Sequence, residues 1–174
     1  MAKRDHLKDY VPTKDGGYEY TGARWAWPSP EVRDEFLRGS LRLFAIGVVC
    51  VVIAGCVPAP GTFGTFYVVI PYLICVIGVA LSGVALFRLS REDNPMRDHV
   101  YSASVPALPV KLLVGALGCI VCAVAALAHG IGLMVVGQGE FIALTLLFSA
   151  LMAAGGACLL AVRVQAEALV FTRS

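Results

Sequence analysis

The sequence predicts an all-α integral membrane protein with four antiparallel transmembrane helices arranged in two hairpins. An N-terminal cytoplasmic tail and an amphipathic lead-in helix are expected before the first span. Of the 174 residues, 58% are hydrophobic and only 15% are charged, whereas a soluble domain carries about 25% charged residues. The apolar residues gather in four long runs, and the basic residues avoid two of the five segments outside those runs.

The four apolar runs cover about residues 43–57, 65–87, 107–135 and 141–162. A bilayer core about 30 Å thick is crossed by about 20 helical residues, and the last three runs reach that length. The first run is shorter, and we expect it to be extended by Leu41 and by the aliphatic stem of Arg42. A helix satisfies its own backbone hydrogen bonds in lipid. Residues 43–174 are therefore predicted to form one four-helix transmembrane region.

The distribution of basic residues predicts the orientation. Eight of the fourteen Lys and Arg residues precede the first run, four lie at positions 88, 91, 97 and 111 after the second run, and two follow the fourth run. The two remaining connections contain none. The positive-inside rule then places both termini in the cytoplasm of a multi-pass cell-membrane protein. The formal net charge of +2 gives no electrostatic support for nucleic-acid binding.

The polar segment before the first span contains several tyrosine and tryptophan residues. Residues 1–28 are predicted to form a cytoplasmic tail that is flexible or ordered by a protein partner. The stretch GGYEYTG at residues 16–22 can form a small hairpin, but two strands alone are marginal in water. Trp25 and Trp27 are close enough to the first span to rest at the level of the lipid headgroups.

The first helix is expected to begin at Ser29. A serine hydroxyl caps a helix, proline suits the first helical position, and Glu31 stands in the first turn. Residues 29–42 are predicted to form an amphipathic helix that lies on the membrane surface. The alternative is that they simply continue the first span.

Small side chains follow one stripe along the third span and a matching stripe along the fourth. Membrane helices associate where small residues let their backbones approach closely, so we expect these two spans to pack as a tight hairpin. The predicted helix-packing seam consists of Gly115, Cys119, Cys122, Ala126, Gly130, Ser149, Ala153 and Ala157.

His129 lies near the outer end of the third span, where a polar side chain should have a partner. Glu140 is the acidic residue just across the following turn. We expect a hydrogen bond between these side chains that pins the top of the hairpin. The functional alternative makes His129 and Glu140 a proton or small-solute site in an oligomeric pathway.

The six cysteines occupy helical positions and are interpreted as small apolar residues, so no disulfide framework, metal site or cofactor is predicted. The tetrapeptide CIVC, from Cys119 to Cys122, resembles the active-site motif of the vitamin K epoxide reductases, which are also four-helix membrane proteins. That resemblance implies quinone-linked thiol oxidoreduction at these two cysteines. It covers four residues, and no second cysteine pair lies in a loop to relay electrons.

The sequence VIAGC at residues 52–56 resembles the lipobox of bacterial lipoproteins, in which lipid is attached to the cysteine, here Cys56. A removable signal has a short basic start, whereas this run follows some forty polar residues. We therefore expect an uncleaved first helix that ends at Pro58.

Taken together, these patterns predict a non-enzymatic accessory, interaction or scaffold subunit. Its expected partners are the lipid bilayer, a further copy of itself or a larger membrane complex, and a cytoplasmic protein that binds residues 1–28. The alternatives are the oligomeric pathway and the thiol oxidoreductase described above.

Overall fold

The structure is a computed structural model that describes residues 10–12, 17–59, 63–92, 94–137 and 141–173. It has four long helices, α1 (Pro30–Cys56), α2 (Phe66–Arg91), α4 (Leu108–Val135) and α5 (Ile142–Glu167), and one short helix, α3 (Asp98–Ser104). The strands are β1 (Tyr10–Pro12), β2 (Tyr18–Tyr20), β3 (Arg24–Ala26), β4 (Met96–Arg97) and β5 (Thr172–Arg173). The four long helices are long and apolar enough to cross a membrane, which confirms the number of helices that was predicted.

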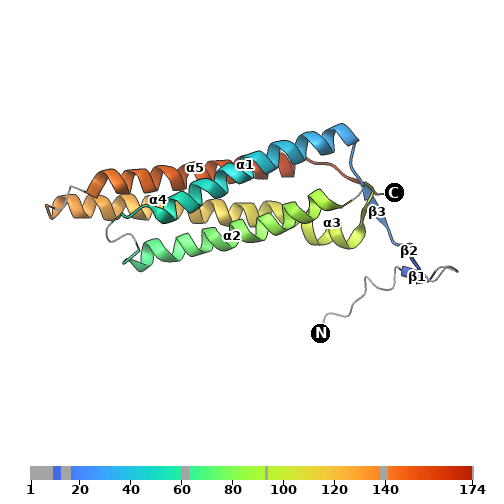
Figure 1. Cartoon of the computed structure of the whole chain (residues 1–174), viewed down its shortest axis with the longest axis horizontal. Coiled ribbons are helices and arrows are strands. Elements are labelled where there is room, and N and C mark those ends of the chain that lie inside the picture. The colour runs from blue at the N-terminus through green and yellow to red at the C-terminus, as the bar shows by residue number, and fades with distance from the viewer. Residues whose placement is uncertain (1–9, 13–16, 60–62, 93, 138–140, 174) are drawn as a thin grey trace.

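The long helices run side by side in an elongated bundle (Figure 1). Helix α1 packs mainly on α5, α5 on α4, and α4 on α2, whereas α1 and α2 have few contacts although they are consecutive in the chain. We call the end that carries β3, β4 and β5 the strand end, and the opposite end, where α1 leads to α2 and α4 leads to α5, the loop end.

Helix α4 lies very close to α2 because glycines leave room for backbone contact. A Cβ atom added at Gly78 would lie 2.6 Å from the Cα atom of Gly115, and one added at Gly118 would lie 2.7 Å from the backbone nitrogen of Cys75. Real Cβ atoms do not approach backbone so closely. These two contacts set the distance between the helices.

Helix α5 uses adjacent glycines to approach two neighbours. A Cβ atom at Gly155 would lie 3.2 Å from Val51 on α1, and one at Gly156 would lie 3.1 Å from the Cβ atom of Cys119 on α4. At the strand end, the Ser40 hydroxyl of α1 donates a hydrogen bond of 2.9 Å to the Gln165 side chain of α5. Close packing of small residues therefore joins α5 to both sides of the bundle.

Helix α1 begins as the sequence predicts. Ser29 is the N-cap, its hydroxyl accepts a hydrogen bond of 3.3 Å from the backbone N–H of Val32, and Pro30 is the first helical residue. Helix α1 is continuous from Pro30 to Cys56, which agrees with the alternative that residues 29–42 continue the first span. Phe36 is buried in this first part, together with Leu37 and Ser40. Burial against the rest of the bundle holds the segment in line with the span.

The segments outside the long helices meet at the strand end. A three-stranded antiparallel sheet has the order β4-β3-β5, so it joins the chain before α1 to the α2–α3 connection and to the chain after α5. Strands β1 and β2 form a separate hairpin in which Tyr10 pairs with Tyr20, and this hairpin lies beyond the end of the bundle (Figure 1). The described part of residues 1–28, which was predicted to be flexible or ordered by a partner, thus contains three short strands.

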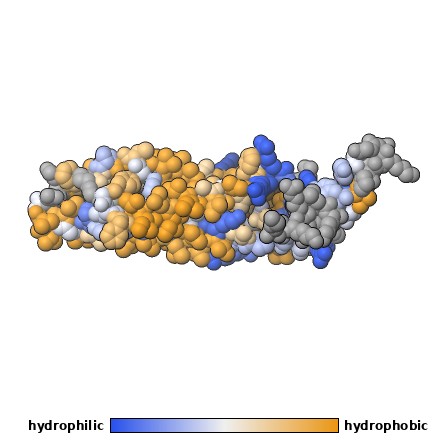
Figure 2. Space-filling view, turned by 90° about the horizontal axis from the view of Figure 1, so that it is seen from below, coloured by the Kyte–Doolittle hydropathy of each residue, from blue (hydrophilic) through white to orange (hydrophobic). Residues whose placement is uncertain are grey.

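The surface is divided along the long axis of the molecule. Figure 2 shows hydrophobic side chains over most of the length of the bundle and hydrophilic side chains gathered toward the strand end. Large apolar side chains on the bundle surface are exposed, among them Ile77 at 58% and Val124 at 60%. In a soluble protein such a surface would be an interaction site or an aggregation risk, whereas hydrocarbon solvates it without cost.

Candidate functional site

Five aromatic side chains from distant parts of the chain pack together at the strand end. We call this group, Trp25, Trp27, Phe36, Tyr101 and Phe171, the aromatic cap. The Trp25 and Tyr101 rings stack with centroids 4.0 Å apart and planes 8° apart. Phe171 meets Tyr101 and Trp27 edge to face, with centroid distances of 5.4 and 4.8 Å. The cap thus connects β3, α3 and the chain after α5.

Hydrogen bonds hold the aromatic cap in register. The indole N–H of Trp25 donates to the Asp98 carboxylate over 2.7 Å, and the backbone N–H of Trp27 donates to the Asn94 side chain over 3.3 Å. Arg33 on α1 donates to the backbone carbonyl of Glu92 over 2.9 Å. Trp27 is only 4% exposed, so it is part of a protein core. This differs from the prediction that Trp27 rests at the level of the lipid headgroups.

A polar hollow of about 280 Å³ lies next to the cap, between the β1–β2 hairpin and the α2–α3 connection. Arg97 forms its base by donating to the Glu92 carboxylate over 2.8 Å and to the Tyr10 hydroxyl over 3.1 Å. The hydrogen bond with Tyr10 and then the one with Glu92 raise the pKa of the Arg97 guanidinium above its ordinary value. The hollow is lined by Tyr10, Tyr18, Tyr20, Arg24, Glu92, Pro95 and Arg97.

The β1–β2 hairpin is attached to the bundle through Tyr20 and has an exposed side chain on each of its two faces. The Tyr20 hydroxyl accepts a hydrogen bond of 3.3 Å from the backbone N–H of Asp98. By contrast, Tyr18 is 75% exposed and Val11 is 49% exposed. Exposed tyrosine is enriched where proteins bind other proteins. The hairpin can therefore contact another molecule without leaving the bundle.

His129 is partnered by α2. The Tyr67 hydroxyl lies 2.7 Å from Nδ1 of His129, and within the described chain the buried Nε2 atom has no hydrogen-bond partner. A hollow of about 280 Å³ lies beside this pair. Glu140, the predicted partner, lies outside the described residues. Sequence reasoning missed Tyr67 because it looked for a partner across the nearest turn.

The cysteines of the CIVC stretch do not face each other. The Cys119 thiol lies 3.0 Å from the Cys75 thiol on α2, and the Cys122 thiol donates to the backbone carbonyl of Val68 over 3.5 Å. All three side chains are completely buried. The six cysteines are free thiols, and Cys56 at the end of α1 is exposed. The sequence could not identify Cys75 as a neighbour, since this depends on which helices touch.

The residues of the predicted packing seam have two different environments. Those on α4 face the interior: Cys119 and Cys122 are 0% exposed and Ala126 is 1% exposed, and Gly115 and Gly130 are also buried. On α5, Ser149 is buried, whereas Ala153 and Ala157 are exposed. These two alanines lie in a groove on the outside of α4 and α5.

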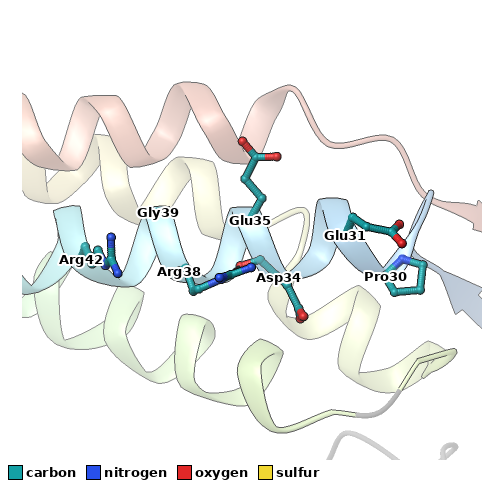
Figure 3. Close-up of a pocket in the computed structure, with 7 residues that line it drawn as sticks. All are labelled: Pro30, Glu31, Asp34, Glu35, Arg38, Gly39 and Arg42. Atoms are coloured by element: carbon teal, nitrogen blue, oxygen red, sulfur yellow. Dashed lines mark hydrogen bonds between the residues drawn. The ribbon is translucent and has the colours of Figure 1, made fainter.

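A charged face marks the first three turns of α1, where a shallow hollow of about 640 Å³ is lined by Pro30, Glu31, Asp34, Glu35, Arg38, Gly39 and Arg42 (Figure 3). Arg38 donates to the backbone carbonyl of Asp34 over 3.2 Å. Figure 3 shows Glu35 pointing away from Arg38, on another side of the helix. Along the helix axis the acidic residues Glu31, Asp34 and Glu35 come first, and Arg38 and Arg42 follow them toward the apolar part of α1.

Comparison with known proteins finds no matching family model, no matching curated protein and no matching solved structure. Within the part of the chain that the structure describes, no group of three or more His, Cys, Asp or Glu side chains could hold a metal ion. The candidate site with the most built-in structure is therefore the strand end, comprising the aromatic cap and the hairpin beside it.

Proposed function

We propose that this chain is a multi-pass cell-membrane protein whose strand end lies in the cytoplasm, and that it acts as a non-enzymatic accessory or scaffold subunit. Its four long helices cross the bilayer as two antiparallel hairpins. The length and apolar surface of the helices support insertion. The orientation is supported by the basic residues, which are concentrated in the segments of the strand end.

The observation that carries the interaction role is the exposed hairpin on a fixed base. The aromatic cap, in which Trp27 and Phe36 are buried and the other three rings are partly buried, ties the chain just after the hairpin to α3 and to the segment after α5. A flexible recruitment tail would need no such attachment. A partner that binds an already ordered surface loses less conformational entropy than one that must order it. We infer that a cytoplasmic protein binds the hairpin through Tyr18 on one face and Val11 on the other.

The test is capture of a stoichiometric partner from native membranes by the full chain. Changing Val11 and Tyr18 together to serine removes the exposed apolar contacts of the hairpin and leaves the aromatic cap intact. We expect the partner to be lost from the purified complex. The matched control is Val170→Ser, which changes a side chain that is 71% exposed and lies beside Phe171 of the cap. A partner retained by the double variant, or lost equally with Val170→Ser, contradicts the proposal.

The Tyr67–His129 pair supports a second candidate, a proton or small-solute pathway between copies of the chain. A hydroxyl bonded to an imidazole can pass a proton, and the pair lies near the loop end. Proton flux into vesicles that contain the purified protein would test it. Flux that disappears in His129→Ala and persists in Tyr72→Phe supports the pathway, whereas absence of flux in the unaltered protein contradicts it.

A further inference from the structure

The polar hollow beside the aromatic cap lies between two surfaces of different chemistry, and the first of them is the β1–β2 hairpin. Tyr10 pairs with Tyr20, and Tyr18 lies two residues before Tyr20 on the same strand. Side chains along a strand alternate between its two faces, so the three tyrosines share one face, and all three line the hollow. The hairpin therefore presents a tyrosine face to the hollow.

The second surface is formed by β3 and β4, which carry two arginines on one face. Arg24 pairs directly with Arg97, and residues directly opposite each other in an antiparallel pair lie on the same face. The neighbouring pair, Trp25 with Met96, lies on the other face, where Met96 is completely buried. Both arginines line the hollow. Like charges directly opposite each other destabilise a sheet, and an anion bound between them removes that repulsion.

Arg97 is held in place and keeps donors for a ligand. Its Nε atom donates to the Glu92 carboxylate over 2.8 Å, and its Nη1 atom donates to the Tyr10 hydroxyl over 3.1 Å. Its Nη2 atom makes no hydrogen bond to the described residues, and the side chain is 45% exposed. The Arg24 guanidinium lies over the Tyr20 ring, 5.9 Å from its centroid. A ligand in the hollow would thus meet two guanidinium groups that are already positioned.

The chemistry and the size of the hollow indicate its ligand. Guanidinium groups bind phosphate oxygens in a bidentate manner, and tyrosine hydroxyls also bind them. The described lining has two of the former and three of the latter. At about 280 Å³ the hollow is smaller than the pockets of about 300–1,000 Å³ that enclose drug-sized ligands, so it suits a single phosphate group. The Glu92 carboxylate beside Arg97 repels such an anion and limits its affinity.

We propose that this hollow is a phosphate-binding site, in which Arg24 and Arg97 hold a phosphate group and the Tyr18 hydroxyl contacts it from the hairpin. The ligand is the phosphate of a lipid headgroup or of a soluble phosphate compound. The site goes beyond the accessory role proposed above and does not depend on it. Only the lipid source requires the proposed membrane insertion.

The depth of the hollow is within reach of both sources. The last turn of α2 carries Arg88 and Arg91, basic residues that suit the headgroup level, and Glu92 of the hollow follows directly. Residues 88 and 92 are about 6 Å apart along the helix axis, and the headgroup layer on each side of a bilayer is about 5–7 Å thick. The hollow therefore opens where the headgroups meet the cytoplasm.

The experiment measures binding of inorganic phosphate to the purified full chain in neutral detergent micelles by titration calorimetry. The unaltered protein should bind phosphate, and Arg24→Gln should weaken binding about tenfold or more, because a charge-assisted contact is lost. Arg173→Gln is the matched control and should bind normally, because Arg173 pairs with Trp25 and so lies on the other face of the same sheet. Glu92→Gln keeps an acceptor for Arg97 and removes the repelling charge, so it should tighten binding about threefold.

Phosphatidic acid added to the micelles identifies the source of the phosphate. Displacement of inorganic phosphate by this lipid assigns the site to a headgroup, whereas retention of inorganic phosphate in its presence assigns the site to a soluble compound, and both results support the site. The proposal is overturned if the unaltered protein binds neither probe, if Arg24→Gln and Arg173→Gln bind phosphate equally, or if Glu92→Gln does not tighten binding. A purely structural role for the ion pair between Glu92 and Arg97 predicts no such gain.

Discussion

Replacing Gly118 by alanine should destabilise the protein, although alanine favours helices more than glycine does. The added Cβ atom would lie 2.7 Å from the backbone nitrogen of Cys75 on α2, and comfortable carbon contacts begin at about 3.5 Å. Helices α2 and α4 must therefore move apart by about 0.8 Å, a gap that forfeits a quarter to a half of the local dispersion energy. Overpacking of this kind costs about 1–3 kcal/mol, which exceeds the helix-propensity gain of at most about 1 kcal/mol.

Gly132→Ala is the control on the same helix, because nothing lies within 4 Å of a Cβ atom at Gly132. It should be neutral or stabilise the protein by up to about 1 kcal/mol. The assay is reversible unfolding of the purified protein in mixed detergent micelles, followed by circular dichroism. The reasoning is refuted if Gly118→Ala is as stable as the unaltered protein, or if the two alanine variants lose stability equally.

Three further predictions concern other parts of the molecule. Trp25→Phe keeps the stack on Tyr101 but removes the donor to Asp98, so thermal unfolding should show a loss of about 1–2 kcal/mol; an unchanged midpoint contradicts this. Cys56 is exposed at the loop end, so a membrane-impermeant maleimide should label it on intact cells, and the label should be lost in Cys56→Ala. If labelling requires permeabilised cells, the proposed orientation is reversed. If Cys56 is not labelled and the intact mass of the protein is increased, the cysteine carries a lipid. Glu167→Gln breaks a surface ion pair of 2.8 Å with Arg163 and should change the free energy of unfolding by less than about 0.5 kcal/mol; a larger loss would mean that this pair is not solvent-screened.

The helices were predictable because their signal is local. An apolar run long enough to span a bilayer can be recognised from the sequence without knowing which helices it contacts. The predicted starts at residues 65, 107 and 141 fall one residue before α2, α4 and α5. The start of α1 was equally predictable, because the N-cap Ser29 and the first helical residue Pro30 act on the first turn of their own helix.

The strand end was not predictable, because its signal is distributed over the whole chain. Strands β3, β4 and β5 have two or three residues each, which is too short for an alternating pattern. Their pairing brings Trp25 opposite Met96 and Arg173, residues that nothing in the sequence links. The aromatic residues of the tail were noticed, but an aromatic residue beside a span fits a headgroup anchor as well as a small protein core.

The helix order in the bundle has the same origin, and it explains the groove. The periodicity of small residues on α4 was interpreted as a single seam for α5, yet α4 packs against two helices: Gly118 meets Cys75 on α2, while Cys119 meets Gly156 on α5. The spacing of small residues shows that one face of a helix carries small side chains, but it does not show which neighbouring helix packs against that face. On α5 the contacts with α1 and α4 are made at Gly155 and Gly156, so Ala153 and Ala157 are not needed inside the bundle. They line the groove on the outer surface of α4 and α5 instead.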